Sequence, residues 1–336
     1  MANYSFPSNA ELQLVAQEKR ATLTLNDPIF TYFPIETRNT DVVMWEQMDS
    51  YTGLAQVRGM NGQFARVNPK GGKRYIMAPG YYGEVSTVDE QMLTSLRPFG
   101  NLIGTLDATT LVLQKQEQML SREIDRMRQV LWLLAVAGTF SVQSEIGSII
   151  HTDSYPVQTA VGSTWATRAT ATPLADLFAL NILGWGRGVR FDSTATAYYN
   201  QTTINNLINN QNPNDLFGKR KAIGASVFSI ADVNQIMLDN NLPIIHVWDD
   251  GYLDDTGVFQ LFIPNGKGVV FGKRIDGSQV GACIETRNAS NPGSAPGPYN
   301  AVVESERPPK LIEVFRGTNW GPAIMFPGSV ISHNVS

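Results

Sequence analysis

The chain has 336 residues, of which 43% are hydrophobic and 17% charged, and its formal net charge is −4. This length is enough for one large domain or two medium domains with a sizeable core. The slight negative charge excludes the global attraction to nucleic acid that a cationic domain shows. The single cysteine, Cys283, excludes an intramolecular disulfide framework and suits a reducing compartment.

Signals for export or membrane insertion are missing from the sequence. Residues 1–11 do not combine a cationic region with an apolar core, as a secretory signal does. The longest apolar run, residues 130–137, is far shorter than the ~20 residues that a membrane span needs. We therefore expect a soluble protein that is made in a cytoplasm.

The first 50 residues are predicted to form an arm rather than a domain. Ser8 and Glu11 have the spacing of a capping box, which predicts a short helix ending near Arg20. Two proline breaks follow, at Pro28 and Pro34, and the apolar residues around them show no sustained period. Two interpretations stay open: this segment packs on the core of its own chain, or it packs on a neighbouring chain.

Residues 51–95 are expected to form a long two-stranded ribbon. Extended stretches at 53–67 and 74–88 flank the turn-forming sequence NPKGG at 68–72. No Asp or Glu occurs between Asp49 and Glu84, whereas the ribbon carries five cations: Arg58, Arg66, Lys70, Lys73 and Arg74. A ribbon of this kind is marginal in isolation. It is either a solvated basic hairpin or a segment that lies across an acidic neighbour, and the five cations are our candidates for contacts between subunits.

The strongest regular element is a helix over residues 107–137. Asp107 is a plausible N-cap, no proline or glycine interrupts the segment, and Gly138 ends it. A one-sided apolar stripe predicts the packing face: Leu113, Leu120, Ile124, Met127, Leu131 and Leu134. The helix would be about 45 Å long. With fewer than four clean heptads, packing on a sheet of the same chain is favoured over a coiled coil.

The rest of the chain is predicted to be mixed α and β. Thr172 and Pro173 predict a helix start, and further helices fit 202–210 and 230–240. Strands fit 140–154 (one or two), 244–248, 258–263 and 268–271, with a loop at 288–298. The end of the chain predicts strands near 299–305, 310–315 and 323–335.

Signatures of catalysis are absent from the sequence. No HExxH, CxxC, GxSxG or Walker-type motif occurs, and each of the three histidines is alone in its segment. The glycine-rich run at 184–188 follows a predicted helix, which favours a helix stop and turn over a nucleotide loop. We therefore predict no catalytic residues, cofactor or metal, and regard Cys283 as a buried or incidental thiol.

An acidic cluster is the one exception to consider: Asp249, Asp250, Asp254 and Asp255. Close carboxylates bind Ca²⁺ or act as an acid–base pair. Their spacing does not match an EF-hand loop, and the adjoining Asp-Gly and Thr-Gly pairs are ordinary turn residues. A solvated turn is therefore the favoured interpretation, and cation binding is the alternative.

The order of elements and several local sequences resemble one known family. Residues 83–89 (GEVSTVD) before 97–100 (RPFG), Trp165 before 171–177 (ATPLADL), and 262–267 (FIPNGK) are similar to segments of tailed-phage major capsid proteins. These have the Hong Kong 97-type fold, and the likeness is to the lambda-like capsid family. The third segment differs by an asparagine, Asn265, where that family has aspartate.

The resemblance implies an α+β fold with a defined division of the chain. An N-terminal arm would occupy 1–50, an E-loop ribbon 51–95, and a peripheral domain 96–168 with its spine helix at 107–137. An axial domain would occupy 169–297, peripheral-domain strands 298–318, and a C-terminal strand, back in the axial domain, 319–336.

The function that the resemblance implies is that of a major capsid protein, not an enzyme. Copies would assemble through hexamers and pentamers into an icosahedral shell around the double-stranded DNA of a tailed bacteriophage, without reading its sequence. Implied partners are further copies, a separate scaffolding protein, a portal and a candidate decoration or cement protein. No covalent cross-link is predicted. The shell would belong to the virion and assemble in the cytoplasm of a bacterial host.

Three rival functions remain open. The first is a shell protein of an encapsulin-like cellular compartment, which shares the fold. The second is an enzyme that uses the acidic loop at 249–255. The third is a phage tail or decoration protein, which would rarely combine a long spine helix with a basic ribbon.

Overall fold

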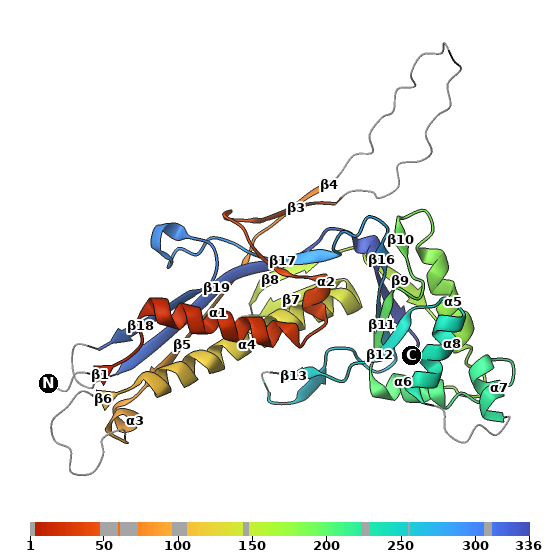
Figure 1. Ribbon diagram of the computed structural model, residues 1–336, viewed down its shortest axis with the longest axis horizontal. Helices are drawn as coiled ribbons and strands as arrows, with labels where there is room; N and C mark the ends of the chain where they lie inside the picture. The colour runs from red at the N-terminus through yellow and green to blue at the C-terminus, as the bar shows by residue number, and fades with distance from the viewer. Residues whose placement is uncertain are drawn as a thin grey trace. The chain divides into compact units, whose positions relative to one another are not determined.

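The computed structural model describes residues 4–47, 60, 73–95, 106–143, 148–222, 229–254, 256–305 and 311–336. The chain forms two compact units (Figure 1). Unit 1 comprises Met1–Val43, Ile76–Arg128 and Cys283–Ala323, and unit 2 comprises Met44–Tyr75, Gln129–Ala282 and Ile324–Ser336. Among the described residues, no helix is long and apolar enough to cross a membrane.

The helix α1 begins where the sequence predicts it, whereas α2 and α3 were not predicted. Both halves of the capping box form at the start of α1: Ser8 accepts from the amide of Glu11, and the Glu11 carboxylate accepts from the amide of Ser8. The helix continues five residues beyond the predicted end, to Leu25. The helices with residues in this unit are α1 (Asn9–Leu25), α2 (Ile29–Tyr32), α3 (Glu90–Ser95) and α4 (Thr109–Ala137).

The long helix α4 starts two residues later than predicted. Asp107 is not its N-cap, because Asp107 lies in the short strand β6 (Leu106–Asp107), which pairs with β1 (Tyr4–Ser5). The backbone amide of Ala108 also bonds to Ser5, so the strand pairing runs up to the helix start. The boundary between the two units falls within α4, after Arg128.

The sheet of unit 1 is built on one long strand, β19 (Ile312–Ile324), which pairs with three others. They are β5 (Gly80–Val88), β18 (Tyr299–Glu304) and β17 (Gly281–Glu285), and β2 (Ile35–Thr37) follows β17. The prediction of separate strands at 310–315 and 323–335 was wrong here. A single strand continues through residues 316–322, because β5 pairs with it as far as Trp320, where the ring of Tyr82 stacks on that of Trp320 with centroids 5.0 Å apart.

Part of the predicted ribbon belongs to the main sheet. Residues 80–88 form β5, which pairs in register with Ile312 to Trp320 of β19. The preceding strand, β4 (Lys73–Met77), pairs with β3 (Val43–Gln47). Residues 53–67 lie outside the described part of the chain except for residue 60.

Apolar residues of the arm are buried in the core of unit 1. Leu12 and Ala16 of α1 are buried, as are Ile29 and Phe33 after it. Leu12 belongs to a cluster contributed by α1, β5, α4 and β19 of the same chain, and α1 lies along α4 (Figure 1). These apolar residues therefore pack on their own chain.

Among the described residues, a second five-stranded sheet lies in unit 2, and four small two-stranded pairings have residues in this unit. The sheet has the order β12-β11-β15-β20-β9. Its strands are β9 (Gln158–Val161), β11 (Thr196–Tyr199), β12 (Ile244–Val247), β15 (Lys267–Phe271) and β20 (Val330–Asn334). The pairings are β7 (Thr139–Gln143) with β8 (Ile149–Ser154), β10 (Val189–Arg190) with β16 (Lys273–Arg274), β13 (Gly251–Leu253) with β14 (Phe259–Leu261), and β3 with β4.

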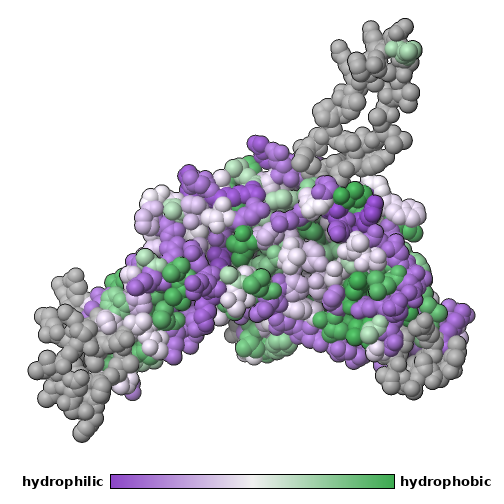
Figure 2. Space-filling model, viewed as in Figure 1, coloured by the Kyte–Doolittle hydropathy of each residue, from purple (hydrophilic) through white to green (hydrophobic). Residues whose placement is uncertain are grey.

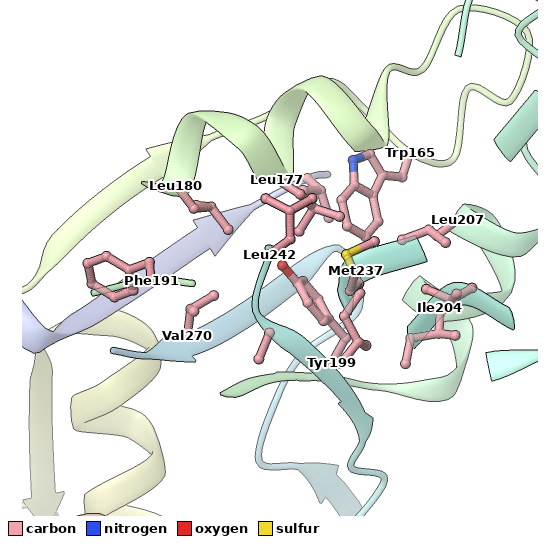
Figure 3. Close-up of a cluster of buried hydrophobic side chains, with 14 of the residues drawn as sticks. Trp165, Leu177, Leu180, Phe191, Tyr199, Ile204, Leu207, Met237, Leu242 and Val270 are labelled. Atoms are coloured by element: carbon pink, nitrogen blue, oxygen red, sulfur yellow. The ribbon is translucent and has the colours of Figure 1, made fainter. Parts of the chain in front are cut away.

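The helices of unit 2 cover a dense apolar core. They are α5 (Pro173–Leu183), α6 (Gln201–Ile208), α7 (Leu216–Ala222) and α8 (Ile230–Asp239), close to the predicted ranges except for α7, which was missed. Figure 3 shows Leu177 and Leu180 of α5 pointing toward Val270 and Tyr199 on the sheet. The described residues also include two single turns of 3-10 helix, Pro292–Ser294 in the predicted loop and Pro327–Ser329.

Candidate assembly surfaces

The stem of the ribbon is described, and it is tied together by one aromatic stack and one ion pair. Trp45 of β3 stacks on Tyr75 of β4 with ring centroids 5.5 Å apart. Arg74 bonds to the carboxylate of Glu46 at 2.9 Å, with both side chains largely exposed. Glu46 lies just before the acid-free stretch between Asp49 and Glu84, so the stem is less one-sidedly basic than predicted.

The five candidate cations are therefore placed only in part. Lys73 is exposed on the stem, and Arg74 is paired within its own chain. Three candidates lie outside the described residues: Arg58, Arg66 and Lys70. The stem itself is anchored, since Trp45 is buried and its ring also lies 5.6 Å from that of Tyr155. Trp45 thus connects Tyr75 of β4 with Tyr155.

The apolar stripe of α4 lies in the interior. Leu120, Ile124 and Met127 are buried in the stretch that belongs to unit 1, and Leu131 and Leu134 in the stretch that belongs to unit 2. Leu113 is partly buried against the core of unit 1. The sequence stripe missed Trp132, which is fully buried among aromatic rings of unit 2. The one-sided stripe covers a single face of the helix, whereas the C-terminal end of α4 is buried on more than one face, so Trp132 fell outside the stripe.

A buried charge network lies in unit 1 and was not predicted. Glu123 of α4 lies 2.5 Å from Arg316 of β19 and 3.9 Å from Arg20 of α1. Arg20 also pairs with Glu285 of β17, and Arg316 donates to Asn300 at 2.7 Å. Since two cations face two anions, the charges balance inside the protein. The network ties the arm helix, the long helix and the sheet together. Its four residues lie far apart in the sequence, so no sequence motif indicates it.

Cys283 lies in the same region and is completely buried. Burial raises the pKa of its thiol, and the neighbouring carboxylate of Glu285 adds to this effect. A protonated, inaccessible thiol is a poor nucleophile and a poor metal ligand. Its surroundings are those of a core residue.

The acidic cluster lies at the hairpin β13–β14, and its carboxylates hold the local backbone. Asp249 accepts from the amide of Gln201 at 2.7 Å, at the start of α6. Asp254 accepts from Thr256 and Val258 in the turn, and these bonds lower its pKa to about 2, with the hydroxyl of Thr256 contributing most. Asp255 lies outside the described residues. Within the described part of the chain, no three His, Cys, Asp or Glu side chains are grouped to hold a metal ion.

Two of the three histidines, His151 and His333, are buried, and His246 is exposed. His333 is buried, and its Nδ1 lies 2.6 Å from the hydroxyl oxygen of Tyr199. Burial lowers the pKa of His333 to about 4, and that of His151 also to about 4. The ring of His151 packs edge-on against Phe140, and that of His246 stacks on Tyr198. The glycine-rich run forms the predicted helix stop, with Gly184 as C-cap of α5.

Two solved structures show the same fold as this chain. One is a protein from Escherichia coli CFT073 assigned as the capsid protein of a prophage; it is 11% identical, with a TM-score of 0.61, covering 99% of this chain and 100% of its own. The other is a phage-related protein from Bordetella bronchiseptica RB50, 8% identical with a TM-score of 0.55, covering 96% of each chain. The Hong Kong 97-type fold is thereby confirmed. A search of curated proteins found no match.

The family is shown by sequence. The model of the family described as phage major capsid protein E matches residues 12–314, from the arm helix to the central strand β19. This span includes the ribbon, the long helix and the acidic hairpin. The chain therefore belongs to the phage major capsid protein E family and is a capsid shell protein.

Proposed function

We propose that copies of this chain assemble through hexamers and pentamers into an icosahedral shell that encloses the double-stranded DNA of a tailed phage. The observation that carries the proposal is the family match over residues 12–314. The role is structural rather than catalytic. In support, Asp249 and Asp254 hold the local backbone, and His333 is buried with a tyrosine partner.

The proposal also assigns the parts of the chain to domains. Residues 1–50, 96–168 and 298–318 would form the arm and peripheral domain, and residues 169–297 and 319–336 the axial domain. Unit 1 agrees with this grouping where it joins the first 43 residues to 96–128 and 298–318, and unit 2 where it joins 169–282 to 324–336. Residues 129–168 lie in unit 2 and residues 283–297 in unit 1, so the two units divide the chain at different places from the proposed domains.

In the assembled shell, the ribbon would be the arm that reaches a neighbouring copy. Its cations Arg58, Arg66, Lys70, Lys73 and Arg74 would face acidic residues there. The anchored stem supports this role, because Trp45 and Tyr75 fix the base while Lys73 stays exposed. Contacts made between copies rather than within one copy make stability depend on assembly.

The other partners follow from the same proposal. A separate scaffolding protein would guide assembly, a portal would occupy one vertex, and a decoration or cement protein is a candidate for the mature shell. The net charge of −4 favours enclosing DNA over binding it tightly. Assembly would take place in the cytoplasm of the bacterial host.

Sedimentation tests this proposal. The purified chain is centrifuged alone and with the scaffolding protein encoded beside it. We expect species far larger than the 36.9 kDa of one chain, in discrete steps for rings and closed shells. A single boundary at the mass of one chain, with scaffolding protein and at low salt, would contradict the proposal.

A further inference from the structure

Two separate hydrophobic surfaces remain exposed on unit 2. The first lies at the end of α5, where Ile182 is 57% and Trp185 74% exposed, and at Ile275, which is 65% exposed. The amide of Ile275 bonds to the carbonyl of Gly188, so Ile275 lies against the turn that follows α5. We call these three side chains the α5 patch. Figure 2 shows hydrophobic surface (green) where Figure 1 places α5.

The second surface is on the hairpin β13–β14. Leu253 and Phe259 are direct cross-strand partners, so their side chains lie on the same face of the hairpin. They are 69% and 54% exposed. On the other face, Tyr252 stacks on the buried Phe262 with ring centroids 5.8 Å apart. The hairpin is thus anchored by one face and leaves the other face open.

The charges around the two surfaces have opposite signs. Exposed cations border the α5 patch: Arg187, Arg190 and Lys273. Arg190 and Lys273 are paired in register on β10, which follows the same turn, and β16. The hairpin instead carries Asp249, Asp250 and Asp254, and no Lys or Arg occurs between Lys221 and Lys267. Both surfaces are exposed in one copy, so they do not cover each other.

We infer that the hairpin face of Leu253 and Phe259 docks on the α5 patch of a second copy of this chain. Apolar side chains would meet at the centre of the contact, and the aspartates of one copy would face Arg187, Arg190 and Lys273 of the next. Such a contact joins two different surfaces of the same molecule, so it repeats from copy to copy, and it closes into a ring when the rotation between copies divides a full turn. The inference rests on the proposed function and names the surfaces that would build its rings.

Cysteine cross-linking tests the contact in the full-length chain. The double variant Leu253→Cys/Ile275→Cys is assembled and treated with oxidant or a short bismaleimide; the native Cys283 is buried. We expect a covalent ladder that stops at the size of the ring. Each single variant should give no ladder, because only one of the two docking surfaces then carries a cysteine. The matched control Leu253→Cys/Ile149→Cys, which uses another exposed isoleucine of unit 2, should give none.

The outcomes separate this inference from the proposed function. Shells that form without a ladder would overturn the docking while leaving the shell function standing. Dimers formed by a single variant would overturn it too, since they would indicate like surfaces in contact. If nothing assembles under any condition, the shell function fails and the docking fails with it.

A charge variant gives a second readout that does not depend on cross-linking geometry. Arg190→Glu places an acid opposite the acidic hairpin, and we expect the assembled fraction to fall about tenfold at low salt, with a smaller effect at high salt. The matched control Arg168→Glu, at an exposed arginine elsewhere in unit 2, should assemble normally. Circular dichroism verifies that both variants fold. Equal assembly of the two would overturn the docking.

Discussion

The guanidinium Nε of Arg316 lies 2.5 Å from the carboxylate Oε2 of Glu123, and both side chains are almost completely buried. This pair joins the central strand β19 to the long helix α4 inside unit 1. Arg20 and Glu285 complete the network, so each charge has an opposite neighbour. A balanced network of this kind tolerates burial, whereas removing one member leaves a charge unpaired.

Removing Glu123 should therefore destabilise unit 1 strongly. Glu123→Leu leaves Arg316 and Arg20 with Glu285 as the only carboxylate of the network. We expect the free energy of unfolding to fall by about 3–5 kcal/mol, measured by urea unfolding of the unassembled chain. Glu117→Leu is the matched control on the same helix. Its carboxylate pairs with Lys19 at the surface, so it should cost less than about 1 kcal/mol. Equal costs would contradict the role of the network.

The aromatic cluster around Trp132 should be the corresponding weak point of unit 2. Its ring contacts those of Tyr198, Trp248, Phe262 and Phe271, at centroid distances of 5.7–6.5 Å. Trp132→Ala would open a cavity and lower the free energy of unfolding by about 3–5 kcal/mol. Trp185→Ala, at an exposed tryptophan, should change it by no more than about 0.5 kcal/mol. A small effect of Trp132→Ala in thermal or urea unfolding would contradict the packing.

The buried His333 should make the fold sensitive to acid. Its folded-state pKa of about 4 lies below the ordinary value of 6.5, so between these values the unfolded chain binds a proton that the folded chain does not. Stability is therefore complete above pH 6.5 and falls as the pH drops toward 4, by on the order of 3 kcal/mol for this group. Urea unfolding at several pH values measures the loss.

Substitutions separate this histidine from the others. His333→Gln should be less stable at neutral pH, because it disturbs the bond to Tyr199, but its stability should fall less steeply between pH 6.5 and 4. His151, whose pKa burial also lowers to about 4, would account for part of the remaining slope. His246→Gln, at an exposed position on the same sheet, should leave the profile unchanged. An unchanged slope in His333→Gln would refute the assignment.

The ribbon stem should matter for assembly and not for folding. Lys73→Glu reverses an exposed charge, and we expect it to slow shell formation while changing the free energy of unfolding by no more than about 0.5 kcal/mol. Light scattering follows assembly over time. The control Lys219→Glu reverses an exposed lysine on α7 and should assemble at the normal rate. Equal assembly rates for the two variants would contradict a role of Lys73 in the contact between copies.

Local signals in the sequence predicted the helices well. The capping box of Ser8 and Glu11 and the uninterrupted segment before Gly138 gave two helix positions to within a few residues. The long strand β19 was missed because Gly317 and the glycine and proline near its end read as breaks. In the sheet, Gly317 pairs with Gly83 of β5, so the neighbouring strand compensates for its weak strand preference. The extended conformation at Gly317 therefore depends on its pairing with β5.

Contacts between residues far apart in the chain could not be predicted from the sequence. The four charges of the network come from α1, α4, β17 and β19, and no spacing rule connects residues so far apart. The same is true of β5, which reads as half of a hairpin but finds its partner in β19. The acidic cluster was easier, because Asp254 bonds within its own turn and turn chemistry is local.

Electron cryomicroscopy of the purified chain, assembled with its scaffolding protein, tests the central claim most directly. The account predicts closed icosahedral shells in which hexamers and pentamers of this chain are resolved, with each ribbon lying over an adjacent copy. Compact single chains under every condition, or irregular aggregates without rings, would contradict it.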